Sequence, residues 1–123
     1  MKNIKQLVIE EATKLREHAT VLERSRLDIE GLNPKINTLC IYGQMTRDCW
    51  SKRATDLLNM CTTPYSRHIK EFTPTLDLEF KPTIGRRFSP IEVFITDQDP
   101  TINHILVAYI KGQRNTLTIE DLS

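Results

Sequence analysis

The sequence is poor in glycine, in histidine and in long apolar runs, and each shortage excludes a class of protein. Only four of the 123 residues are glycine, too few for a glycine-rich loop that cradles a phosphate. The three histidines are scattered and form no H-E-x-x-H pair, so we expect no metal site. No apolar run approaches the roughly 18 residues of a membrane-spanning helix, and no apolar signal-peptide region opens the chain. We therefore expect an intracellular protein without a membrane partner.

The spacing of the cysteines and the net charge of the chain exclude further classes of function. Cys40, Cys49 and Cys61 match neither a C-x-x-C pair nor a zinc knuckle, so we expect reduced thiols in or near the core. The 17 cations and 16 anions leave a net charge of +1, whereas general nucleic-acid binders carry a strong basic excess. General nucleic-acid binding is therefore not expected. A local basic pocket for a small phosphate-bearing ligand remains open.

Apolar residues at helical spacing predict helices in the first half of the chain. Residues 3–18 read as an amphipathic helix with charges on the opposite face. Thr20–Glu23 is a capping box, which predicts a second, shorter helix ending before Gly31. Ser51 or Asp48 caps a further helix. The apolar stripe of that helix comprises Ala54, Leu57, Leu58 and Cys61.

Helix signals return toward the C-terminus. Ser89–Glu92 places proline at the first helical position and glutamate two positions later, which predicts a short helix. The apolar residues 93–95 suit a strand equally well. Asp99 begins a clearer helix with apolar residues at three- and four-residue spacing, and Gly112 is its expected C-terminal cap.

The middle of the chain predicts strands. Apolar and acidic residues alternate over 76–80, which is typical of a half-buried strand, and residues 65–72 are a looser candidate to pair with it. Residues 38–42 read as a short strand or an extended approach to a loop, and residues 117–119 as a closing strand. The predicted class is α+β in a single domain, 1–123. It has an N-terminal helix or helix pair, a small central antiparallel sheet and further helices toward the C-terminus.

Two groups of cations lie at predicted helix ends. Arg47, Lys52 and Arg53 gather at a helix start, where free N–H groups and the positive end of the dipole favour an anion. The alternative is a solvated surface cluster. Lys111 and Arg114 follow a helix end, where cations are expected on dipole grounds alone.

Arg86-Arg87-Phe88 is the third basic segment and the one that contains an aromatic ring. Arginine offers a planar fork for phosphate, and Phe88 or Tyr65 offers a face on which a purine can stack. The alternative is that Phe88 packs on the helix that follows it as a hydrophobic staple. Both interpretations stay open at this stage.

The block Cys40–Thr46, followed by Ser51-x-Arg53-Ala54 and Leu57, resembles the first type of Thoeris anti-defence protein of phages and prophages. Two later stretches resemble the same family, Ser89–Val93 and Tyr109–Gly112. The chain departs from the family pattern at Arg47, where glycine is expected, and at Trp50, where phenylalanine is expected.

The resemblance implies a protein that is not an enzyme and has no catalytic residue, metal or cofactor. Such proteins bind cyclic ADP-ribose isomers made by bacterial TIR-domain immune proteins and hold the signal intact in the cytoplasm of the infected host. The family assembles from dimers, some members form hexamers, and some also hold cyclic di- or trinucleotides.

The resemblance also implies roles for particular residues. Phe88 would stack the adenine, while Arg53 and Arg87 would hold the phosphates. Lys52, Arg86 and Tyr65 are the further candidates for this ligand site. Arg114, with Lys111 nearby in sequence, would line a second site that depends on oligomerisation.

Two other functions are compatible with the residues. A phage protein-interaction or structural module without a small ligand would use the helix at 3–18 as its partner-binding face. The apolar stripe of that helix packs either on its own domain or on a second copy. A small hydrolase or transferase would instead use Cys49 or a histidine as its reacting group.

Overall fold

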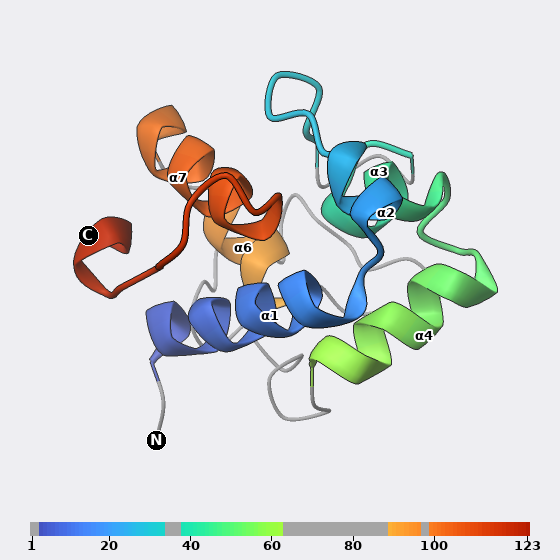
Figure 1. Cartoon of the computed structure of the whole chain (residues 1–123), viewed down its shortest axis with the longest axis horizontal. Helices are drawn as coiled ribbons and strands as arrows, with labels where there is room; N and C mark the ends of the chain where they lie inside the picture. Colours follow the sequence, from blue (N-terminus) through green and yellow to red (C-terminus); the bar gives the residue numbers. More distant parts are fainter. Residues whose placement is uncertain (1–2, 34–37, 63–88, 97–98) are drawn as a thin grey trace.

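A computed structural model describes residues 3–33, 38–62, 89–96 and 99–123, and these residues form helices around a shared core (Figure 1). The elements in chain order are α1 (Ile4–His18), α2 (Val21–Ser25), α3 (Ile41–Thr46), α4 (Lys52–Cys61), α6 (Pro90–Thr96), α7 (Pro100–Ile110) and the 3₁₀ turn η2 (Glu120–Leu122). Among the described helices, none combines the length and the apolar character needed to cross a membrane.

Helix α1 is the centre of the packing. It contacts α4, α6 and α7, and it lies across the middle of the molecule (Figure 1). Its inward stripe comprises Leu7, Val8, Glu11, Ala12 and Leu15, all of which are buried. Because this stripe is covered by the chain's own helices, it is not available as the partner-binding face that the interaction alternative assigned to it.

Four helix starts that the sequence predicts are confirmed. In each, a side chain accepts a hydrogen bond from a backbone N–H of the first turn, which otherwise lacks a partner. The capping residues are Thr20 for α2, Ser51 for α4, Ser89 for α6 and Asp99 for α7. The expected end of α7 is also confirmed, since Gly112 adopts φ +82° just after it.

The predicted central antiparallel sheet is wrong, because the described residues contain helices and no strand. Residues 38–42 do not extend into a strand; the Cys40 thiol accepts a hydrogen bond from Gly43 N at 3.3 Å and starts α3. Residues 93–95 are helical, because the Ser89–Glu92 cap starts α6 ahead of them. Residues 117–119 lead into η2. The expected strands at 65–72 and 76–80 lie outside the described residues.

Candidate functional site

The first predicted pair of ligand-binding cations lies at the start of α4. Arg53 donates from Nε and Nη2 to the two carboxylate oxygens of Glu23, at 2.8 Å each. Its Nη2 also donates to the backbone oxygen of His18 at 3.2 Å. Lys52 lies 3.0 Å from Asp56, with its side chain 90% exposed. Arg53 therefore joins α4 to α1 and α2, whereas Lys52 is a surface cation.

The Glu23 carboxylate binds the Arg53 guanidinium, for which the resemblance implied a phosphate partner. It is nearly buried and also accepts the Thr20 N–H, completing the capping box of α2. Its hydrogen bonds from Arg53 are the main reason that its pKa falls to about 2. A phosphate that reaches Arg53 has to compete with this ionised carboxylate.

The second predicted pair of cations binds groups of the loop after α2 and of the C-terminal segment. Lys111 donates from Nζ to the backbone oxygen of Leu27 at 2.9 Å. Arg114 donates to Asp121 at 2.5 Å and to the backbone oxygen of Thr116 at 3.1 Å. Both side chains thus bind protein groups of the described chain.

The remaining predicted ligand residues are Tyr65, Arg86, Arg87 and Phe88, and all four lie outside the described residues. The four described cations bond to different parts of the chain. Arg53 reaches α2, Lys52 stays within α4, and the second pair reaches the loop after α2 and the C-terminal segment.

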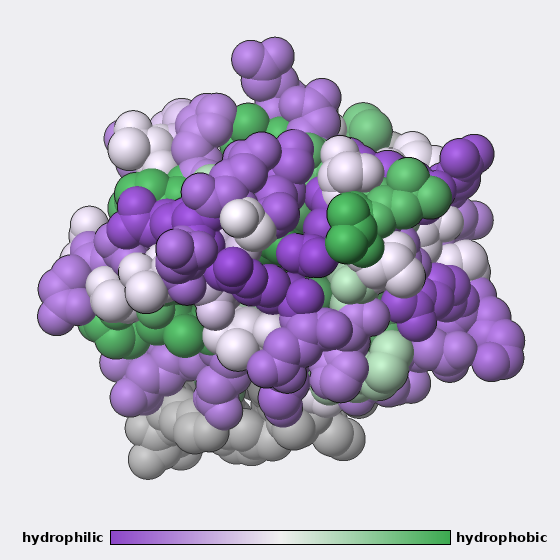
Figure 2. Space-filling model, viewed as in Figure 1, coloured by the Kyte–Doolittle hydropathy of each residue, from purple (hydrophilic) through white to green (hydrophobic). Residues whose placement is uncertain are grey.

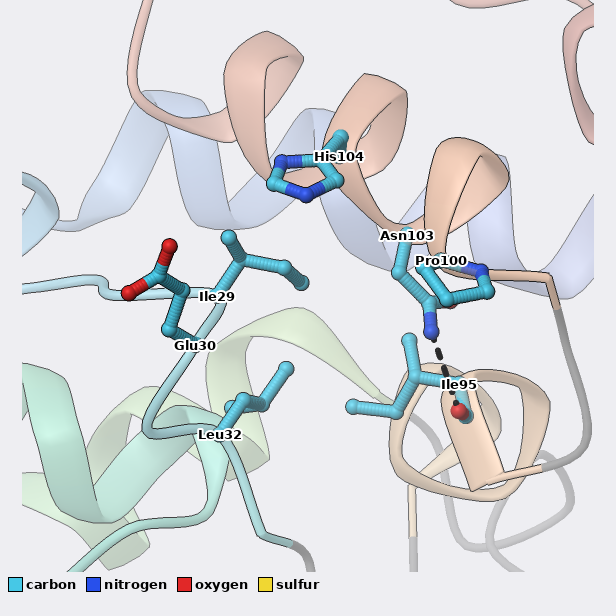
Figure 3. Close-up of a pocket in the computed structure, with 7 residues that line it drawn as sticks. All are labelled: Ile29, Glu30, Leu32, Ile95, Pro100, Asn103 and His104. Carbon is cyan, nitrogen blue, oxygen red and sulfur yellow. Dashed lines mark hydrogen bonds between the residues drawn. The ribbon is translucent and has the colours of Figure 1, made fainter.

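A pocket that the sequence did not predict lies between the loop after α2 and the corner where α6 meets α7 (Figure 3). Its volume is about 270 Å³. The lining residues are Ile29, Glu30, Leu32, Ile95, Pro100, Asn103 and His104. Asn103 links α7 to α6 by donating from Nδ2 to the backbone oxygen of Ile95 at 3.2 Å. The two sides of the pocket are far apart in sequence, so no local pattern could have indicated it.

A buried acid on α1 is the second feature that the sequence did not identify. Glu11 is 1% exposed. One of its oxygens accepts the Ile91 N–H of α6 at 2.9 Å, and the other accepts the Tyr42 hydroxyl of α3. Burial is the main cause that raises its pKa to about 7, and the nearby Glu92 carboxyl adds to the rise. The visible signal was an acid on the apolar stripe of residues 3–18.

The pKa of Glu11 suits a proton-transfer group, but its carboxyl group is buried and not accessible to a substrate. Tyr42, Ser89 and Glu92 are each 0% exposed, and a general acid or base has to reach its substrate. What the carboxylate does in the described structure is accept an N–H at the start of α6, which would otherwise have no partner. Its role is to hold α1, α3 and α6 together.

The cysteines lie in the core, as the sequence predicted. Cys40, Cys49 and Cys61 are buried, with at most 5% exposure. Burial raises the pKa of Cys61 to about 12, which keeps this thiol protonated. Such an environment is the opposite of the electropositive, accessible one that a reactive cysteine needs.

Comparison with protein-family models, curated proteins and solved structures gave no significant match to this chain. The chain is therefore described by its own geometry. It is a helical protein in which a small, mostly apolar pocket lies beside α6 and α7, and the described cations of the predicted sites are bound to the protein's own groups.

Proposed function

We propose that this chain is a phage anti-defence sponge that binds cyclic ADP-ribose isomers without degrading them, as its resemblance to the Thoeris anti-defence proteins implies. It would act in the cytoplasm of the infected host as a homo-oligomer built from dimers. Cyclic di- or trinucleotides are a second class of ligand on the same grounds. The host's immune effector is then deprived of its signal because the signal is held rather than destroyed.

The observation that supports this proposal comes from the block that carries the resemblance. Cys40 caps α3, and Ser51 caps α4. Between the two helices, Arg47 ends α3 with φ 80°. A positive φ of this size favours glycine, the small residue that the resemblance leads us to expect at this position. The backbone of the block thus has the shape that the family residue suits, although the chain carries arginine there.

The contacts of the described cations shift the expected ligand site toward the other candidates. Arg53 is engaged by Glu23, and Lys52 is an exposed cation paired with Asp56. We therefore assign the adenine to Phe88 or Tyr65 and the phosphates to Arg86 and Arg87. Arg114 and Lys111 remain the candidates for the second, oligomer-dependent site.

The proposal is tested by binding and recovery of the ligand. The purified protein is mixed with a cyclic ADP-ribose isomer, freed of unbound ligand and heat-denatured, and the released material is analysed by mass spectrometry. We expect the intact isomer. Recovery of a hydrolysed product would make the protein an enzyme instead. Native mass spectrometry of the loaded protein reports subunit number and ligand stoichiometry together.

The role of Phe88 is tested by substitution. We expect Phe88→Ala to weaken binding of the cyclic ADP-ribose isomer by at least about 1 kcal/mol, because base–aromatic stacking is worth about 1–3 kcal/mol. Isothermal titration calorimetry measures this change. Trp50→Ala is the control, since Trp50 is an aromatic residue with 41% exposure that the proposal gives no ligand contact. Equal affinities of wild type and Phe88→Ala would remove Phe88 from the site.

A protein-interaction module is the second candidate, and one observation favours it. Val21 and Leu22 are 74% and 63% exposed, side by side on the short helix α2. Figure 2 shows an apolar patch on the face where α2 lies. Exposed apolar groups that adjoin each other are typical of interaction sites. This candidate predicts no heat in a nucleotide screen by calorimetry, and a specific host protein whose capture is lost in Val21→Ser/Leu22→Ser.

A further inference from the structure

The pocket between the loop after α2 and the α6–α7 corner is built from two facing apolar walls. In Figure 3, Ile29 and Leu32 project from one side toward Ile95 and Pro100 on the other, and the His104 ring lies above the gap. The volume of about 270 Å³ is just below the range of about 300–1,000 Å³ that is usual for small-molecule sites. The space therefore suits one compact ring with a short side chain rather than a whole nucleotide.

The charged residue at the rim of the pocket favours ligands of one charge over another. Glu30 supplies a carboxylate at the rim, turned outward in Figure 3. None of the seven lining residues is lysine or arginine. Among these lining residues, a phosphate or carboxylate would meet like charge without a lysine or arginine to compensate it, whereas an ammonium group at the rim would meet a carboxylate.

Asn103 provides a second reason to expect a hydrogen-bond donor. Its Nδ2 is used on Ile95, while its Oδ1 is enclosed and has no hydrogen-bond partner among the described residues. An enclosed acceptor without a partner costs about 1–3 kcal/mol. A ligand donor brought to this oxygen would relieve that cost.

We propose that this pocket binds a small aromatic amine, with the ring between the Ile29/Leu32 and Ile95/Pro100 walls and the ammonium group at the Glu30 rim. None of the seven lining residues belongs to the proposed cyclic ADP-ribose site, and the pocket takes ligands of the opposite charge. Its existence does not depend on whether the chain is a sponge.

The test uses three probes of nearly equal shape and different charge: phenethylamine, 2-phenylethanol and 3-phenylpropionate. Each is titrated into the full chain at low ionic strength, and binding is followed in ¹H–¹⁵N spectra at the lining residues and at the Asn103 side-chain amide. We expect saturable shifts there, with phenethylamine binding about two- to fivefold more tightly than the alcohol, as an exposed ion pair provides. The propionate should bind least tightly.

Two variants separate the contributions of charge and wall. Glu30→Gln should remove the preference for amine over alcohol, while Leu32→Ala should weaken both about equally. Glu17→Gln is the matched control, because Glu17 is an exposed carboxylate that does not line the pocket. The proposal is overturned if the lining residues show no shifts at millimolar probe, if amine and propionate bind equally, or if Glu30→Gln keeps the preference. Unchanged folding of each variant is checked by its thermal unfolding midpoint.

Discussion

The backbone of Arg47, at the end of α3, has a strained conformation. Its φ of 80° lies in the left-handed region, where a side chain with a Cβ is crowded by about 1–2 kcal/mol relative to the right-handed region. Glycine has no such penalty in the folded state, although it loses more conformational freedom on folding. The balance of the two effects decides whether arginine at this position is a burden.

We expect Arg47→Gly to raise the free energy of unfolding by about 0.5–1 kcal/mol, because relief of the left-handed strain outweighs the extra entropy of glycine. Chemical denaturation of the two proteins measures the difference. Arg47→Ala is the control: it removes the same charged side chain but keeps the Cβ, so it should give no stabilisation. If alanine stabilises as much as glycine, the effect comes from the charge and not from φ.

Other residues show why cations near helix ends were hard to interpret. Arg26 donates to the backbone oxygen of Met45 at 2.8 Å, and Arg16 donates to that of Arg114 at 2.7 Å. These side chains satisfy carbonyl groups, as Lys111 does with Leu27. A sequence shows that a cation is present, but it does not show whether a carbonyl or a ligand lies within its reach.

At the scale of elements, one guanidinium connects three helices. Arg53, in the first turn of α4, binds Glu23 of α2 with two nitrogens and the last residue of α1 through its backbone oxygen. The planar fork of arginine serves two carboxylate oxygens at once, which the single ammonium group of lysine does not reproduce. The position of α4 against α1 and α2 therefore depends on this side chain.

We expect Arg53→Lys to lower the free energy of unfolding by about 1 kcal/mol, a modest figure because the Arg53 side chain is 40% exposed. Urea unfolding provides the measurement. Lys52→Ala is the neighbouring control, and its exposed pair with Asp56 should contribute at most a few tenths of a kcal/mol. Equal losses in the two variants would contradict the clamp role of Arg53.

At the scale of the whole molecule, the Glu11 carboxyl links stability to pH. Its pKa rises from 4.5 to about 7 on folding, so the native state binds this proton more tightly than the unfolded state does. Stability from this group is therefore full below about pH 4.5 and is lost as the pH rises through about 7. The total loss is about 3 kcal/mol. Glu23, whose pKa falls to about 2, changes its contribution only below pH 4.5.

We expect the free energy of unfolding of the wild type to fall between pH 5 and pH 8, and that of Glu11→Gln to change much less. Glutamine keeps an oxygen for the Ile91 N–H and has no proton to lose. Urea unfolding at one-unit pH steps gives both curves. Glu17→Gln, an exposed acid on the same helix, should keep the wild-type slope. A wild-type slope retained in Glu11→Gln would mean that another group carries the pH dependence.

The helix starts could be predicted from the sequence, whereas the predicted sheet was wrong for the described residues. Each cap joins residues two or three positions apart, such as Thr20 with Glu23 or Ser51 with Ala54, so the signal and its effect lie in the same short stretch. Residues 38–42 carried the local pattern of a short strand or an extended approach to a loop, but α3 begins at Ile41. The Cys40 thiol, an unusual cap, favoured the helix.

The chemistry of the cations and of the pocket depended on distant parts of the chain. Arg53 meets Glu23 across 30 positions, and Glu11 meets Ile91 across 80. Hydrophobic packing of α1 against α4 and α6 brings these groups together, and no spacing in the sequence encodes such a meeting. Local sequence thus decided where the helices begin, because capping is a short-range interaction. Only the packed structure decided which charges pair and where a pocket opens, because both follow from burial between distant segments.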